Sequence, residues 1–403
     1  MKKIATLVAT MTIVLGSFAL LAQEETKKDE GYIFTMQKEC KYTSVKDQHR
    51  SGTCWSFSGI GFLECELLRM GKGEYDLADM WIVNRAYIDK AQMYVRMHGN
   101  YNFGAGGAFF DVFNMIDKYG IMPQTAYIGS SEGDTLPIHG ELDALLKAYV
   151  DVIIQNPNKT LSPTWQKGYE ALVNTYLGEA PAEFTYNGKK YTPTTFAQSL
   201  GLNMSDFISI TSFTHHPFYT KFALEIPDNW IMEESYNLPL NDMMQVINNA
   251  VDNGYSIAWG SDVSTKGFNW GKGVAVVPEK DFSGATAGSD RERWEKLSQS
   301  EKDKELYSFD KPGKEKTITQ EMRQEGFDNW TTTDDHGMVI VGRATDQNGT
   351  PYFIVKNSWG TAGRNPYQGF FYASQPFVEL QTINFVVHKD AIPKTIKAKL
   401  GIK

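Results

Sequence analysis

The spacing of apolar residues changes partway along this 403-residue chain, and that change constrains the fold more than any other feature. Early segments carry apolar residues at helical intervals, over residues 54–70, 77–98, 108–119, 142–152 and 165–176. Later segments are short and typical of strands, over residues 207–213, 222–226, 256–259, 273–277, 338–341, 352–356, 370–373 and 383–387. A helical part followed by a strand-rich part predicts an α+β fold.

Two segments interrupt this plan. Residues 140–205 are mixed and contain the turn dipeptide Asn187-Gly188. Residues 289–325 are densely charged, and we expect them to form a solvated helical excursion.

The composition predicts a folded protein without a nucleic-acid partner. Hydrophobic residues make up 41% and charged residues 22% of the chain, which is ordinary for a globular protein. The net charge is −8, and no dense block of Lys and Arg supplies the basic face that phosphates require.

The first residues have the pattern of a secretory signal peptide. Lys2 and Lys3 precede an uncharged run from Ile4 to Ala22, and a polar segment begins at Gln23. An uncleaved membrane anchor is the competing interpretation. Polar residues within the run favour cleavage after Ala22. We therefore expect an exported protein, periplasmic or secreted, with no stable membrane insertion after cleavage.

The chain has only three cysteines, Cys40, Cys54 and Cys65, which excludes a disulfide scaffold and leaves at least one thiol unpaired. Cys54 lies in the first turn of a predicted helix, where the helix dipole favours a thiolate. We expect Cys65 to lie in the core and Cys40 to be structural or free. A thiolate used as a nucleophile needs an imidazole partner that can move a proton.

Two downstream segments offer such a partner and its support. His336 lies at the start of a predicted strand, in the segment Asp334-Asp335-His336-Gly337. Asn357 follows the next strand and has an amide that can orient an imidazole, while Trp359 can shield that contact from water. The other histidines lack such a context, and we expect them to be surface or core residues: His49, His98, His139, His215, His216 and His388. No His, Cys, Asp or Glu cluster has the spacing of metal ligands, so we expect neither a metal nor a cofactor.

These motifs occur in the chain order of a known family. Gln48, Cys54-Trp55, His336-Gly337 and Asn357-Ser358-Trp359-Gly360 together resemble the papain-like cysteine peptidases. The resemblance implies a papain-like fold, with a helical N-terminal half, a β-barrel-like C-terminal half and an active-site cleft between them, plus insertions. It also implies that Cys54 is the nucleophile, His336 the general acid and base, and Asn357 the group that orients the imidazole. Gln48 would stabilise the oxyanion together with the Cys54 backbone N–H.

The resemblance extends to substrate binding. Gly106 and Gly107 resemble the family's glycines that pair with an extended peptide, although a turn before the next helix explains them equally well. We group Trp359 with them, because core packing and shielding of the site are compatible roles. The implied partners are peptide or protein substrates.

Three departures from the compact papain type indicate the bleomycin hydrolase and aminopeptidase C branch. His336 and Asn357 lie 282 and 303 residues after Cys54, about twice the compact separations. Ser51 stands where compact members have a disulfide cysteine, and too few residues precede the catalytic segment for an inhibitory pro-segment. Residues 106–127, 191–196 and 257–262 add to this resemblance, which implies aminopeptidase activity.

The C-terminal segment departs from that branch, whose members place a C-terminal arm and its carboxylate in the cleft. Here fifteen residues, Lys389–Lys403, follow the strand-like segment Phe385–His388, so we expect the arm to be absent or much shortened. An endopeptidase with an open cleft therefore stays an alternative, as do a non-catalytic peptide-binding protein and an enzyme that transfers the acyl group to an amine. A homo-oligomer is possible, but the sequence gives no support for one.

On these arguments we divide the chain into seven parts. They are a signal peptide (1–22), a helical half with the nucleophile (23–139), a mixed insertion (140–205), the first part of the β-rich half (206–288), a charged helical insertion (289–327), the β-rich half with His336 and Asn357 (328–390), and a tail (391–403).

Overall fold

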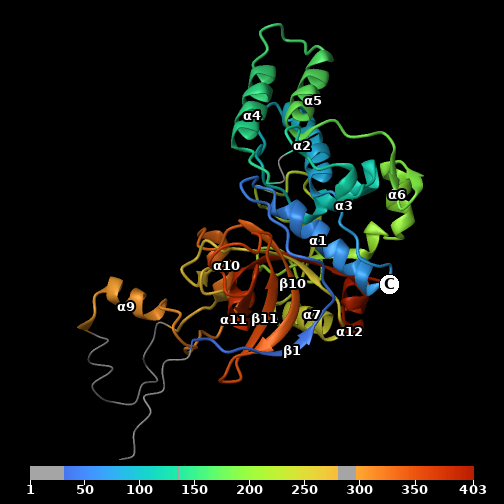
Figure 1. The fold of residues 1–403 in the computed structure, drawn as a ribbon. Coiled ribbons are helices and arrows are strands. Elements are labelled where there is room, and N and C mark those ends of the chain that lie inside the picture. Colours follow the sequence, from blue (N-terminus) through green and yellow to red (C-terminus); the bar gives the residue numbers. More distant parts are fainter. Residues whose placement is uncertain (1–30, 134–135, 280–295) are drawn as a thin grey trace, which may run out of the picture.

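A computed structural model describes residues 31–133, 136–279 and 296–403 of the chain. The expected signal peptide, residues 1–22, and the first part of the charged insertion lie outside these residues. Figure 1 shows two regions, one formed by the helices α1 to α6 and the other by a large sheet with its own helices. No helix in the three described stretches combines the length and the apolar composition needed to cross a bilayer.

Five of the six helices in the helical region agree with the predicted pattern, and the helix at residues 193–200 was not predicted. Its helices are α1 (Cys54–Arg69), α2 (Asp79–Arg96), α3 (Phe109–Tyr119), α4 (Gly140–Ile154), α5 (Thr164–Leu177) and α6 (Pro193–Leu200), with the short turns η1 (Gln124–Ala126) and η2 (Met204–Asp206). Ile60, Leu63 and Leu67 recur at helical spacing on α1, and all three are fully buried in the first core. The turn Asn187-Gly188, with both φ angles positive, joins the hairpin β2 (Phe184–Tyr186) and β3 (Lys189–Tyr191).

The second region is built on an eleven-stranded mixed sheet. In sheet order its strands are β5 (Lys221–Ala223), β6 (Glu234–Asn237), β4 (Phe207–Thr211), β13 (Thr382–His388), β7 (Ile257–Ser261), β10 (His336–Thr345), β11 (Pro351–Lys356), β12 (Phe370–Ser374), β9 (Val274–Ala275) and β8 (Phe268–Asn269), and β1 (Thr35–Glu39) pairs with β10. Most neighbours are antiparallel, but β4–β6 and β12–β9 are parallel. The expected β-barrel-like half is thus an open sheet, because the end strands β5 and β8 do not pair with each other in the part of the chain that is described.

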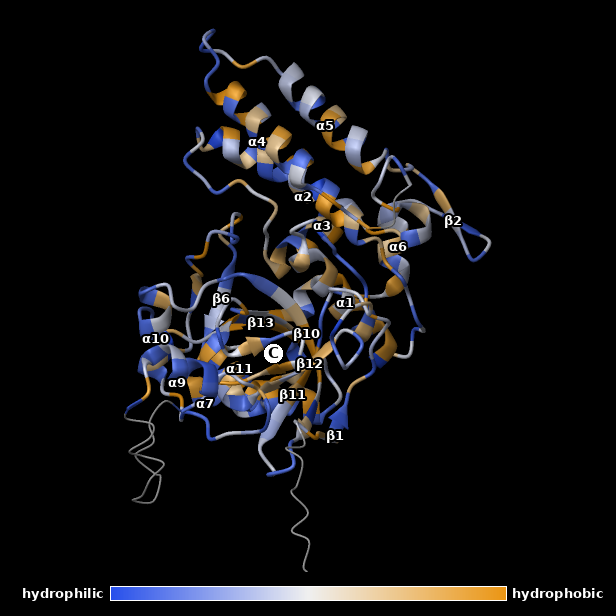
Figure 2. Cartoon of the chain, turned by 60° about the vertical axis from the view of Figure 1, so that its left-hand side comes forward, coloured by the Kyte–Doolittle hydropathy of each residue, from blue (hydrophilic) through white to orange (hydrophobic). Residues whose placement is uncertain are grey.

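A second core lies between this sheet and its helices α7 (Leu240–Asp252), α11 (Gln375–Gln381) and α12 (Lys394–Leu400), with the turn η4 (Lys389–Ala391). Trp259, Phe353 and Phe377 are buried in it. Figure 2 shows hydrophobic residues on the central strands and hydrophilic residues on α9 (Gln299–Leu306). The described part of the charged segment is not one helix, because residues between α9 and α10 (Gln320–Asp328) are not helical.

Buried charges join the two regions where α1 packs against β10. The Lys46 Nζ lies 2.8 Å from Glu64 Oε1 and 3.0 Å from Asp79 Oδ2. The Thr43 hydroxyl donates to Glu64 and accepts from the ammonium of Lys356, which ends β11. All three cysteines are free, and Cys65 is buried in the first core as predicted.

Candidate active site

Cys54 is the first residue of α1, and the chain around it is held from two sides. The indole N–H of the buried Trp55 donates to the Ala105 carbonyl at 3.0 Å. Ser51, buried just before the helix, donates to the Gln48 carbonyl at 2.8 Å. Cys54 is partly exposed, whereas Cys40 and Cys65 are buried. Because Cys54 begins the helix, its backbone N–H has no partner inside α1.

His336 begins β10, and its imidazole is held by an amide from the neighbouring strand. The Nε2 atom of His336 lies 2.8 Å from the Oδ1 atom of Asn357. Asn357 directly follows β11, which pairs with β10. The Trp359 ring stacks on the imidazole, with centroids 4.7 Å apart and an interplanar angle of 29°. The imidazole of His336 therefore contacts both Asn357 and Trp359.

Gln48 joins this group through the segment that carries Asn357. The Ser358 hydroxyl donates to Gln48 Oε1 at 2.7 Å, and the Gln48 backbone N–H donates to the Ser358 carbonyl at 2.8 Å. Gly360 has a φ of +67°, and a side chain there would overlap the Asp47 carboxyl. Antiparallel contact between Asp47 and Trp359 completes this arrangement, which places Gln48 beside the Asn357 segment.

Gly106 and Gly107 allow close packing beside the nucleophile. A Cβ on Gly107 would lie 2.9 Å from the Trp55 ring, and one on Gly106 would overlap the Asp228 carboxyl. The buried Lys90 ammonium donates to the Gly104 carbonyl at 3.0 Å and also to the Gly106 carbonyl. The glycines thus lie where both Trp55 and Asp228 approach the backbone.

One pocket contains three of the seven predicted site residues, and Gln48, Gly106 and Asn357 do not line it. Cys54, Gly107 and His336 line it, together with four polar residues to which the sequence assigned no role: Asp228, Asp334, Asp335 and Asn384. Trp359 lies behind His336 and does not line this pocket. Asn384 is buried, and its amide nitrogen has no hydrogen-bond partner in the described part of the structure.

Burial acts on the nucleophile and the imidazole in opposite directions. It raises the pKa of Cys54 to about 12, against the lowering effect of backbone N–H groups at Gly337 and Trp55. It lowers the pKa of His336 to about 4, against the hydrogen bond that His336 donates to Asn357. Considered one at a time, Cys54 is therefore a neutral thiol and His336 a neutral imidazole near pH 7. This differs from the thiolate expected from the helix dipole alone. A proton passed from Cys54 to His336 would create two opposite charges, which attract each other more strongly in a partly buried pocket than in water, so the two groups can ionise as a pair.

The pocket is acidic at one end. Burial raises the pKa of Asp334 well above its usual range, and the neighbouring Asp228 and Asp335 add to the shift. Burial also raises the pKa of Asp228, which the Lys90 ammonium opposes. Each carboxyl loses hydration in the pocket, which disfavours its ionised form. A cationic ligand beside it would favour the carboxylate again, so each carboxyl is suited to bind a cation. Asp334 could have been found from its position two residues before His336, but no local pattern marks Asp228.

Comparison with known proteins agrees with this geometry. The profile described as papain family cysteine protease matches residues 33–141, and the profile described as Peptidase C1-like family matches residues 280–402. The chain is 22% identical over 417 residues to aminopeptidase C of Streptococcus thermophilus, which covers 92% of this chain and 86% of the relative. It is 19% identical over 424 residues to aminopeptidase C of Lactobacillus delbrueckii subsp. lactis, covering 95% and 87%.

The solved structure of PepW from Lactobacillus rhamnosis has the same fold, with a TM-score of 0.67 and 18% identity over 91% of this chain and 84% of that one. The chain is therefore a papain-family cysteine peptidase with a papain-like fold. Within that family its relatives include the aminopeptidases C.

Proposed function

We propose that this peptidase hydrolyses peptide bonds through Cys54, His336 and Asn357, and that it acts as an aminopeptidase. The catalytic assignment is supported by the shared pocket of Cys54 and His336 and by the 2.8 Å contact between His336 and Asn357. The Cys54 thiol passes its proton to His336, and the sulfur attacks the carbonyl carbon. His336 then protonates the leaving amine, and water hydrolyses the resulting thioester.

The oxyanion formed in this step needs hydrogen-bond donors. The Cys54 backbone N–H, at the start of α1, is one. The Gln48 amide nitrogen is the other, because Ser358 holds the amide by its oxygen. Gln48 is thus oriented before the substrate arrives, which is what oxyanion stabilisation requires.

The observation that supports aminopeptidase action is the position of Asp228. Its carboxyl lies against Gly106 and lines the same pocket as Cys54. In an aminopeptidase substrate, the free amino group is two bonds from the carbonyl carbon that the thiolate attacks. A carboxylate in this pocket can therefore bind the ammonium while the sulfur reaches the carbonyl.

The segment that carries Asp228 also limits the pocket. It leaves β5 in the sheet region and is fastened to the helical region, where Trp230 Nε1 donates to Asp111 Oδ2 at 2.7 Å. Asn102 donates to the Pro227 carbonyl at 2.9 Å and contacts Asp228 Oδ1 at 3.4 Å. A substrate with further residues on its amino side, beyond Gly106, would collide with the segment that carries Asp228. A substrate whose free amino terminus lies beside Asp228 would fit in front of it.

A time course on one long peptide tests this proposal. An aminopeptidase releases residues one by one from the amino end, so mass spectrometry should show a ladder of shortened peptides. Internal fragments as first products would instead indicate an endopeptidase. Labelling of Cys54 by a thiol-directed epoxide without any turnover would indicate a peptide-binding protein.

We also propose that the protein is exported after cleavage behind Ala22, supported by the pattern of residues 1–22. The mass of the protein recovered outside the cytoplasm should correspond to a chain that begins at Gln23. A full-length chain that starts at Met1 and is recovered with membranes would contradict this.

A further inference from the structure

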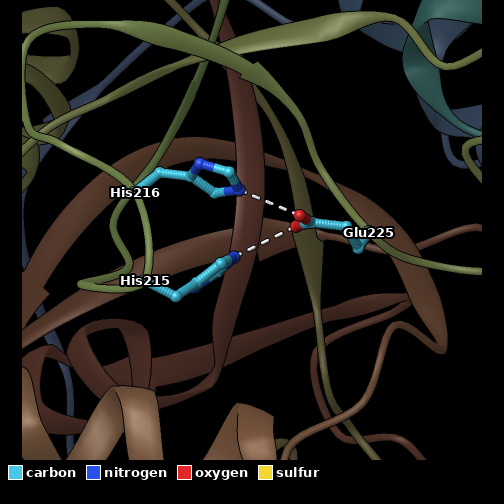
Figure 3. A group of neighbouring side chains, drawn as sticks. All are labelled: His215, His216 and Glu225. Carbon is cyan, nitrogen blue, oxygen red and sulfur yellow. Dashed lines mark hydrogen bonds and ion pairs between the residues drawn. The ribbon is translucent and has the colours of Figure 1, made fainter.

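The loop that joins β4 to β5 carries two adjacent histidines that approach one carboxylate. His215 Nε2 lies 3.0 Å from Glu225 Oε2, and His216 Nε2 lies 2.9 Å from Glu225 Oε1. Figure 3 shows both imidazole rings directed at the two oxygens of the same side chain. The sequence predicted no metal site, because Glu225 is separated from the histidines by β5 and the chain must turn back to bring them together.

Aromatic packing fixes both rings. The His216 ring stacks on Phe222 with centroids 4.1 Å apart and an angle of 23°. The His215 ring stacks on Phe327 of α10, with centroids 5.6 Å apart and an angle of 12°. The rings are therefore already directed at Glu225 without a bound ion, which reduces the entropy lost when a ligand orders them.

The far side of His215 also has a partner. Gln324 of α10 lies against Nδ1, with its Oε1 at 3.3 Å and its Nε2 at 3.1 Å. When the proton of His215 is on Nδ1, that N–H can donate a hydrogen bond to the Gln324 amide oxygen. The Nε2 lone pair then faces Glu225 and is available to an ion. Metal-binding histidines are commonly oriented by such an outer contact.

The carboxylate has the charge that a cation requires. Its two oxygens lie 3.0 Å and 2.9 Å from the two imidazole nitrogens, so an ion between the three side chains would contact a carboxylate oxygen. The side chain is about half exposed, so a hydrated ion can reach it from solvent.

We propose that His215, His216 and Glu225 bind one divalent transition-metal ion of the zinc type, with a fourth position open to water. The three ligand atoms lie within 4.8 Å of one another. Ligands of tetrahedral zinc, at about 2.0–2.2 Å from the ion, are roughly 3.3 Å apart, so small side-chain rotations suffice. Two imidazoles and one carboxylate form a donor set that suits zinc, whereas magnesium and calcium prefer oxygen ligands alone.

The site has a direct connection to the active-site pocket. Ile226, the next residue after Glu225, lines that pocket, and so does Asp228. An ion held by Glu225 would restrain the start of the segment that carries Asp228. We therefore expect the ion to restrict the motion of this segment and to take no part in peptide hydrolysis.

The test is zinc titration of the metal-free full-length chain by calorimetry, in a Cys54→Ala background. That substitution is needed because the thiol and imidazole of the active site could bind zinc themselves. We expect one ion per chain, and Glu225→Gln, His215→Ala or His216→Ala should each weaken binding by at least about 100-fold. Gln324→Ala should weaken it less, by about tenfold. His98→Asn, on an exposed histidine elsewhere, should leave binding unchanged.

The outcome does not depend on peptidase activity, so failure of the proposed function would not affect it. Thermal unfolding without metal must give similar midpoints for the variants and the parent, which shows that the variants fold. Substitution of cobalt for zinc should give the visible absorption of a four-coordinate ion without thiolate bands. Absence of binding, or binding that the three ligand substitutions leave unchanged, would overturn the proposal and leave a hydrogen-bonded ion-pair cluster.

Discussion

Two histidine sites of this protein differ in the partner that holds the imidazole. His336 is buried and contacts the neutral amide of Asn357, whereas His215 and His216 lie at the surface and share the carboxylate of Glu225. An amide orients a ring without fixing its charge, so the ring can accept and return a proton. A carboxylate adds a negative charge, so the rings beside it suit a bound cation. This difference fits the roles that we propose for the two sites, proton transfer at the first and ion binding at the second.

The two sites are also assembled differently. The pocket of Cys54 and His336 lies between the helical and sheet regions and depends on the packing of α1 against β10. The site of His215, His216 and Glu225 depends on one loop, one strand and a contact from α10. The segment from Glu225 to Asp228 connects them, and the following experiments separate their roles.

The largest effect should come from Cys54→Ala. Loss of the nucleophile should lower kcat by at least about 10⁴-fold and abolish labelling by a thiol-directed epoxide. Zinc binding at His215, His216 and Glu225 should not change. Cys40→Ala, which removes a buried thiol outside the pocket, is the matched control and should keep the labelling. Activity that survives in Cys54→Ala would show that Cys54 is not the nucleophile.

Asn357→Ala should have the next largest effect. Without the amide the His336 ring is free to rotate away from Cys54, and we expect kcat to fall by roughly 10²-fold while KM changes little. Steady-state kinetics on a short peptide measures this split. Asn158→Ala, on an exposed loop, should have no effect. If Asn357→Ala has normal kcat, His336 is oriented by Trp359 alone.

The pH dependence should distinguish peptides with free and blocked amino ends. Because burial raises the pKa of Asp228, its carboxyl gains a proton on acidification earlier than an ordinary Asp, whose pKa is about 3.9. Below that raised pKa, kcat/KM for a free-amine peptide should fall about tenfold per pH unit. It should fall again above about pH 8, where the substrate amine loses its proton. Asp228→Asn should remove the contribution of this carboxyl to the acid limb, leaving that of His336.

The smallest effect should come from Glu225→Gln without metal. The substitution keeps the shape of the side chain and lies outside the active-site pocket. We expect kcat and KM on a short peptide to stay within about twofold of the parent values. A large loss of kcat in metal-free protein would show that the ion-binding site and the catalytic site are not separate in function.

Much of the site was accessible from the sequence, because its residues belong to strong local patterns. Cys54 begins a periodic helix, and His336 and Asn357 flank two apolar strands, so α1, β10 and β11 could be predicted along with them. The open sheet could not, since strand order depends on contacts between distant segments. Asp228 lies in an irregular segment that is fixed by Trp230 and Asn102, and neither contact has a local pattern. The site of His215, His216 and Glu225 was missed for the same reason, because β5 separates its ligands.

The account depends most on Asp228 as the group that binds the amino end of the substrate. The direct measurement is kcat/KM for one peptide with a free and with an acetylated amino terminus, in the parent protein, Asp228→Asn and the exposed control Asp117→Asn. We predict that the parent and Asp117→Asn favour the free amine by at least about 100-fold, as expected for an ammonium paired with a buried carboxylate. Asp228→Asn should lose most of this preference and keep its kcat on the acetylated peptide. An unchanged preference in Asp228→Asn, or none in the parent, would contradict the account.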